Sequence, residues 1–136
     1  MHDVTDAAAI ADEAMNNLVA ALATHDPEQV LDVFTRNGAV FGSDAGEEAV
    51  GRDQLLAFFT AICARSDTIS WTWDLRTAEH LGDVVWFAAS GTCVFTRADG
   101  SSLVAADPYR ISGVLRRTQG RWLFALFNGS EPQIPA

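Results

Sequence analysis

The feature that most constrains this chain is a hairpin near its C-terminal end. Two runs rich in β-branched and aromatic residues, Tyr109–Arg117 and Arg121–Ser130, flank the short turn Thr118-Gln119-Gly120, a pattern typical of a β-hairpin. The second run is apolar at every position from Trp122 to Phe127. An antiparallel strand with one wet face alternates apolar and polar residues, so this run predicts a strand buried on both faces. The domain's own helices can cover one face, and a second copy of the chain can cover the other.

Long strands are predicted throughout the second half of the chain. They span Thr68–His80, Val84–Arg97 and Ser102–Arg117, the last of which extends the first arm of the hairpin. Strands much longer than the usual ~5–6 residues must coil or bend. Gly91 and Pro108 lie inside these strands and mark the expected bends or bulges.

The first half of the chain reads as helical. A helix is predicted over residues 6–24 from its four-residue apolar repeat, and a short helix starts at the N-cap Asp26 and is closed by Asn37-Gly38. A short strand at Ala39–Gly42 and an acidic loop precede a third helix over about Arg52–Ala64.

The resulting order is ααβαββββ, which indicates an α+β class and a single domain over residues 1–136. We expect a curved antiparallel sheet wrapped around the three N-terminal helices, shaped like a cone with an internal cavity.

Charge excludes several classes of function. The net charge is −9, with 18 acidic residues against 9 basic ones, so binding to a nucleic-acid backbone is not expected. The sequence has no Lys, which excludes Schiff-base and phosphate-lysine chemistry, and no cofactor is expected. The three His residues do not pair at metal-ligand spacing, so no metal site is expected.

The remaining composition favours a cytoplasmic protein. No apolar run approaches the ~20 residues of a membrane span, and no leader is evident at the acidic, Ala-rich N-terminus. Cys63 and Cys93 have no CxxC spacing, so we interpret them as buried, reduced thiols.

Polar side chains at the end of the last strand suggest a pocket. Asn128 and Ser130 share one face beside apolar walls, so we expect them to contact a ligand, with a strand-end or bulge role as the alternative. Arg110, inside an apolar strand, needs either an internal carboxylate or an anionic ligand. Three tryptophans can line a pocket for a ring-shaped ligand or can belong to the core or a dimer interface: Trp71, Trp73 and Trp86.

Two carboxylates are candidate bases. Asp74 shares the polar face of its strand with Arg76, where it is either a base in the pocket or a solvent-facing residue. Asp107 precedes Pro108 and is either a pocket acid or a turn residue. The acids of the loop before the third helix, Asp44, Glu47 and Glu48, can ligate a cation or simply be solvated.

Three segments, YRISGVLRRTQGRW, FNGSEP and FGSDAGEEAVGRDQL, resemble the nuclear transport factor 2-like superfamily, in its ketosteroid isomerase and polyketide-cyclase-like branch. The resemblance covers nearly the whole chain. It implies a cone-shaped α+β barrel with an internal pocket and a homodimer formed through the outer face of the sheet.

The resemblance does not carry a reaction. The isomerases place a Tyr on the first helix, and this chain has Tyr109 alone, on a strand. The cyclases use a carboxylate where this last strand has Asn128 and Ser130. We therefore expect a domain that binds a small apolar ligand without an assigned reaction. The alternatives are an acid-base enzyme, with Asp74 or Asp107 as base and Asn128 and Tyr109 as polarising donors, or a pure dimerisation module.

Overall fold

The structure is a computed structural model that describes residues 5–101 and 107–133 of the chain. Its helices are α1 (Thr5–Ala23), α2 (Pro27–Leu31) and α3 (Arg52–Cys63). Its strands are β1 (Phe34–Phe41), β2 (Glu48–Val50), β3 (Thr68–Leu81), β4 (Val84–Thr96), β5 (Asp107–Thr118) and β6 (Arg121–Ser130). The predicted α+β class is confirmed. Within the described ranges, none of the helices has the length and apolar character needed to cross a membrane.

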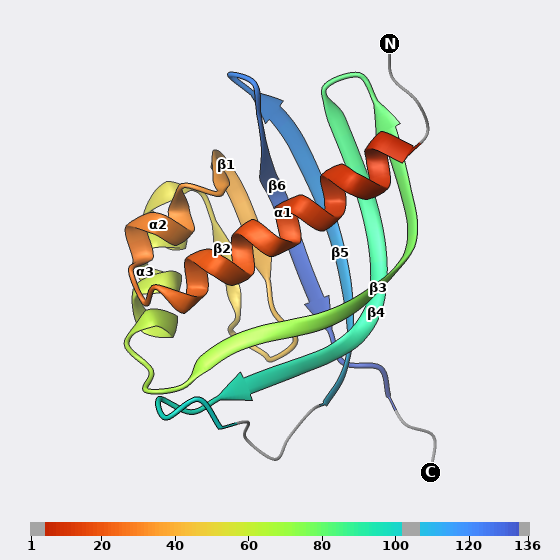
Figure 1. The fold of residues 1–136 in the computed structure, drawn as a ribbon. Coiled ribbons are helices and arrows are strands. Elements are labelled where there is room, and N and C mark those ends of the chain that lie inside the picture. Colours follow the sequence, from red (N-terminus) through yellow and green to blue (C-terminus); the bar gives the residue numbers. More distant parts are fainter. Residues whose placement is uncertain (1–4, 102–106, 134–136) are drawn as a thin grey trace.

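The described strands form one sheet in the order β2-β1-β6-β5-β4-β3. Neighbouring strands are antiparallel except for β1 and β6, which run parallel. The sheet is open, because β2 and β3 form its two edges. Figure 1 shows the sheet curving strongly, with α1 lying diagonally across its concave face and α2 and α3 at one side. The predicted curved sheet around N-terminal helices is therefore confirmed, with one parallel pairing in it.

The start of the sheet differs from the sequence prediction in two respects. The short helix ends at Leu31, well before Asn37-Gly38, and β1 begins at Phe34. Phe34 is buried, with its ring 5.3 Å from that of Phe59 and 5.5 Å from that of Phe124, so strand pairing buries an aromatic ring that a longer helix would place elsewhere. The second difference is β2, which lies within the segment predicted as an acidic loop and pairs with β1.

Gly91 allows the two strands of the β3–β4 ribbon to approach closely. This residue pairs with Trp73, and a Cβ atom at Gly91 would overlap the backbone carbonyl of Thr72. Only glycine permits such a close approach of two backbones. The register shift of this ribbon lies between Leu75 and Thr77, and the bend expected at Gly91 stays a prediction.

The last strand fails to alternate because it contains a bulge. Phe124 and Leu126 pair with consecutive residues of β5, so Ala125 has no partner on that strand. The shift lets Phe124 and Phe127, three positions apart in sequence, both face the core, where both are buried. The apolar run thus has a second cause besides two buried faces. In the single chain the outer side of β6 is only half-buried, and its cover by a second copy remains a prediction.

The convex face carries one apolar strip across the middle of the sheet. Trp86 of β4, Val114 of β5 and Leu126 of β6 are directly paired neighbours, and all three are half-buried. Paired residues point to the same side of a sheet. We call these three residues the outer strip. The next pair along the strands is polar, Ser112 with Asn128.

Candidate functional site

The concave face encloses a small hollow beneath α1 and α3, which we call the inner hollow. Its volume is about 50 Å³. Aromatic side chains from four strands contribute to its wall: Phe34 of β1, Trp71 of β3, Tyr109 of β5 and Phe127 of β6. Among its described lining residues, Glu47 of the β1–β2 loop is the charged one. An apolar enclosure with few polar groups is the usual form of a small-molecule site.

Trp71 is the most informative residue of this wall. Its ring lies 5.2 Å from the ring of Phe127 and 6.4 Å from that of Tyr109. Its side chain is buried, and within the described part of the chain its Nε1–H is the buried side-chain polar group without a hydrogen-bond partner. Leaving a buried donor unpaired costs roughly 1–3 kcal/mol. An acceptor supplied by a ligand would remove this cost.

Tyr109 fits the wall because Gly129 of the neighbouring strand β6, which pairs with Ile111, leaves space for the Tyr109 ring. A Cβ atom at Gly129 would overlap the phenolic oxygen of Tyr109, so glycine makes room for the phenol. Burial raises the pKa of Tyr109 to about 12, against a lowering by a hydrogen bond from Ser43 and with smaller raising contributions from neighbouring negative groups. The phenol is therefore neutral at physiological pH and can donate a hydrogen bond.

A second hollow, which we call the mouth, lies beside the inner hollow and has a volume of about 130 Å³. The two spaces share four lining residues, namely Glu47, Ile62, Ile69 and Tyr109. Carboxylates from three parts of the chain line the mouth: Asp44 and Glu47 of the β1–β2 loop, Asp107 at the start of β5 and Glu131 after β6. The mouth also contains the buried thiol of Cys93, whose pKa is raised to about 11, mainly by burial.

Glu47 joins the two hollows, and local hydrogen bonds fix its position. Its Oε1 accepts from the backbone N–H of Asp44 at 2.7 Å, and its backbone carbonyl accepts from the N–H of Gly42 at 2.7 Å. The sequence analysis treated Glu47 only as one acid of a loop. The motif FGSDAGEEAVGRDQL gave a signal that this loop matters, but not which of its acids turns inward.

Arg65, the cation of the mouth, is already engaged. Its guanidinium donates to both carboxylate oxygens of Asp67, at 2.7 and 2.8 Å, and lies 5.3 Å from the ring centre of Phe95. The hydrogen bonds from Arg65 are the largest cause that lowers the pKa of Asp67. The mouth therefore holds four carboxylates and one guanidinium, whose charge is shared between Asp67 and Glu47.

Asn128 and Ser130 lie outside both hollows, contrary to the expectation that they close the pocket. Both are exposed, whereas Phe127 and Gly129 between and beside them face inward. The bulge at Ala125 sets which side chains of β6 face the core, and sequence alternation alone could not locate it. Arg110 pairs with Ser130 and is also exposed, so it needs no internal partner.

Asp74, Trp73 and Trp86 also lie away from the inner hollow. The Asp74 side chain is 75% exposed and lies 3.6 Å from Arg76, as in the solvent-facing alternative, so it does not serve as a base in the hollow. Trp73 is half-buried and donates to Asp12 of α1 at 2.9 Å. Trp86 belongs to the outer strip and donates to Glu79 at 3.1 Å. Of the sequence-predicted residues, the structure brings together Trp71, Tyr109 and Asp107.

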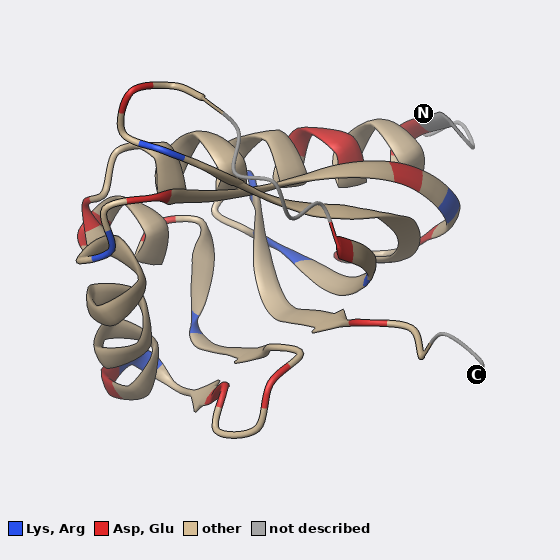
Figure 2. Ribbon diagram, turned by 90° about the horizontal axis from the view of Figure 1, so that it is seen from below, with Lys and Arg blue, Asp and Glu red and all other residues tan. Residues whose placement is uncertain are grey.

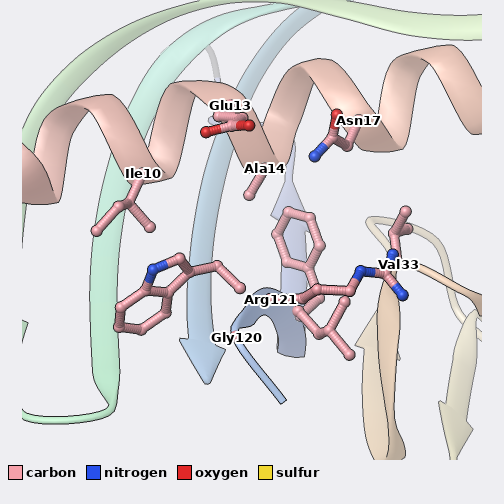
Figure 3. Close-up of a pocket in the computed structure, with 10 residues that line it drawn as sticks. Ile10, Glu13, Ala14, Asn17, Val33, Gly120 and Arg121 are labelled. Carbon is pink, nitrogen blue, oxygen red and sulfur yellow. The ribbon is translucent and has the colours of Figure 1, made fainter. Parts of the chain in front are cut away.

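A third space is a groove between α1 and the start of β6, with a volume of about 240 Å³. Figure 3 shows Ile10 and Ala14 pointing from α1 into it, and the Arg121 side chain extending toward Val33. Arg121 donates to Asp32 at 3.1 Å, so its charge is engaged. The unpaired buried donor found among the described residues, Trp71 Nε1, belongs to a residue that lines the inner hollow and not this groove. We therefore place the candidate site in the inner hollow and the mouth.

Comparison with solved structures defines the class of fold. The chain is similar to a proposed aromatic ring hydroxylase from Novosphingobium aromaticivorans, with a TM-score of 0.78, 20% identity, and 98% of this chain and 94% of that chain covered. A proposed dehydratase of the NTF2-like family from Streptomyces avermitilis matches with a TM-score of 0.74, 18% identity, and coverage of 96% and 98%. A ketosteroid isomerase-like protein from Erwinia carotovora atroseptica matches with a TM-score of 0.70, 19% identity, and coverage of 93% and 96%. At such identities these likenesses establish the NTF2-like fold alone.

A sequence model described as the SnoaL-like domain matches residues 11–134. The chain therefore belongs to the SnoaL-like domain family, within the NTF2-like superfamily, and the resemblance drawn from the sequence is confirmed. A search of curated proteins found no match.

Proposed function

We propose that this protein binds a small, largely apolar molecule in the inner hollow, with entry through the mouth. The observation that carries the proposal is the Trp71 indole N–H, which is buried in an aromatic wall without a partner. A ligand with an apolar body and one hydrogen-bond acceptor would satisfy this donor and fill the hollow.

The volumes limit how the ligand lies. An apolar cavity of about 150 Å³ accepts a benzene ring. The inner hollow, at about 50 Å³, is too small for a ring by itself, whereas the mouth adds about 130 Å³. A ring-shaped ligand would therefore occupy both spaces, with one end near Trp71 and the other near Glu47.

Two-dimensional NMR of the indole N–H groups tests the proposal. The chain has 4 tryptophans, so single Trp→Phe variants assign each resonance. Addition of cyclohexanone, acetophenone or phenol should move the Trp71 signal downfield. The Trp73 signal is the internal control, because that N–H already donates to Asp12. The proposal fails if no compound of the panel moves the Trp71 signal or raises the melting temperature.

An acid-base enzyme is the second candidate, favoured by the position of Glu47 between the two hollows and of Asp107 at the mouth. Two structural neighbours are described as a proposed dehydratase and as ketosteroid isomerase-like, and both descriptions refer to reactions that involve proton transfer. In this reading Glu47 or Asp107 removes a proton next to a carbonyl, and neutral Tyr109 donates to the carbonyl oxygen.

Deuterium exchange distinguishes the two candidates. In deuterium oxide, an enzyme of this kind would replace the α-protons of cyclohexanone by deuterons faster than buffer does, and Glu47→Gln or Asp107→Asn would slow the exchange. Exchange at the buffer rate, with binding still visible at Trp71, would support the binding domain over this reaction.

We also propose that two copies associate through the outer strip. Three half-buried apolar side chains on adjacent strands, bordered by the polar pair Ser112–Asn128 on one side and by Arg116 on the other, have the composition of a small interface core with a polar rim. The two cysteines are free and buried, which fits the reducing conditions of the cytoplasm.

A further inference from the structure

The mouth of the hollow carries an excess of negative charge. Asp44, Glu47, Asp107 and Glu131 line it, and the guanidinium of Arg65 is bound to Asp67 through Nε and Nη2, two of its three donor nitrogens. Figure 2 shows acidic positions in the β1–β2 loop, at the start of β5 and just after β6. These carboxylates come from segments that are distant in the sequence, so the fold itself assembles them.

The negative charge of the mouth contributes to the raised pKa values of Cys93 and Tyr109. Burial is the largest cause of the raised pKa of Cys93; the charges of Asp107, Glu131 and Glu47 raise it further, and the charge of Arg65 lowers it by a smaller amount. Burial is also the largest cause of the raised pKa of Tyr109, and the charges of Glu47 and Glu131 raise it further. The potential at the entrance therefore opposes the formation of a second negative charge and favours a positive one.

The wall behind the carboxylates suits an organic cation. Aromatic rings attract a cation placed within about 6 Å of the ring face, and Tyr109, which lines both the mouth and the inner hollow, supplies such a ring. Within the described ranges, no three His, Cys, Asp or Glu side chains are grouped as metal ligands. The carboxylates of the mouth are spread around an opening, an arrangement that fits an ammonium group on an apolar body.

We infer that the ligand is a small ring-bearing amine whose ammonium group lies among the carboxylates of the mouth and whose apolar body, carrying an oxygen acceptor, reaches toward Trp71. This inference rests on the proposed function, because it names the class of ligand for the same space. It also excludes carboxylic acids, which the mouth would repel.

Tyramine, tyrosol and phloretate form a matched series that tests the charge alone. All three carry the same phenol ring, and their chain ends are an ammonium, a neutral hydroxyl and a carboxylate. In calorimetric titrations at neutral pH and low salt, tyramine should bind at least about tenfold more tightly than tyrosol, and phloretate should bind most weakly. The preference for tyramine should shrink as salt rises toward physiological ionic strength.

Adjacent glutamates provide the matched variants. Glu47→Gln keeps the acceptor for the Asp44 N–H but removes a charge that lines both hollows, so it should lower the preference for tyramine over tyrosol several-fold. Glu48→Gln removes the same charge from an exposed neighbour that does not line the hollows, and it should leave the preference nearly unchanged.

The outcomes separate the inference from the proposed function. Tyrosol binding as tightly as tyramine, or equal effects of the two glutamate variants, would overturn the inference and leave the pocket intact. Absence of tyramine binding also overturns it. If cyclohexanone, acetophenone and phenol also leave the Trp71 resonance unmoved, the proposed function fails with it.

Discussion

The two faces of this sheet are made by the same strands, yet they differ in what they hold. The concave face carries fully buried side chains such as Phe87, Phe124 and Leu115. The convex face carries the half-buried outer strip between polar residues such as Asn128. A residue's place in the strand alternation, as shifted by bulges, therefore decides its environment. The hydrophobicity of the segment does not.

The largest effect is expected where the concave face is most tightly packed. Phe124→Ala should lower the free energy of unfolding by about 3–5 kcal/mol, because it removes a ring that contacts Phe34 and Phe127 and leaves a cavity. Leu126→Ala, on the other side of the same strand, should cost only about 1–2 kcal/mol. Urea unfolding at one protein concentration measures both. Equal losses would mean that the two faces are not packed differently.

A charge introduced on the convex face should change the assembly state of the protein. Val114→Asp places a carboxylate in the outer strip and should weaken association by about 2 kcal/mol or more, giving monomers at micromolar concentration in sedimentation velocity. Thr118→Asp, at the exposed end of the same strand, is the control and should leave association unchanged. A wild-type protein that sediments as a monomer would refute the proposed dimer.

A smaller effect is expected from closing the space beside Tyr109. Gly129→Ala introduces a Cβ atom against the phenol, and it should cost about 1–3 kcal/mol and weaken ligand binding as the ring moves. Ser130→Ala, the next residue on the opposite face, should change stability by less than about 0.5 kcal/mol. Thermal unfolding compares the pair. A neutral Gly129→Ala would show that the phenol has room to spare.

Burial on the concave face should also produce a pH dependence, which is confined to alkaline solution. The chain has a single tyrosine, so tyrosinate absorbance reports Tyr109 alone. The folded protein should titrate near 12, while the unfolded chain titrates near the ordinary 10.0. Because the folded pKa is the higher, the stabilising contribution is complete below pH 10 and is lost as pH rises toward about 12. A folded-state midpoint near 10 would place the phenol in water.

Much of the fold could be predicted because local signals agree with the global structure. Asp26 caps α2 as expected and accepts from the N–H of Glu28 at 3.0 Å, and Gln119-Gly120 turns the hairpin with positive φ at both residues. The pairing of Phe34 with β6 was not predictable in this way. It depends on contacts with residues about ninety positions away, which outweigh a local helix signal.

The candidate site was only partly predictable for a similar reason. Trp71 and Tyr109 fall on the inner face of clean alternating stretches, so their position follows from the sequence. Asn128 was assigned to the wrong side because one unpaired residue, Ala125, reverses the alternation before it. Glu47 was missed as a lining residue because a loop has no periodicity from which to infer direction.

The position of β6 also bears on how the protein is made. This strand follows every other described strand in sequence, yet it lies inside the sheet, between β1 and β5. During translation, β1 therefore has β2 on one side but no partner on the other until residues 121–130 leave the ribosome. Part of the apolar concave surface therefore stays exposed in the nascent chain until this final strand inserts. Folding is complete only at that point.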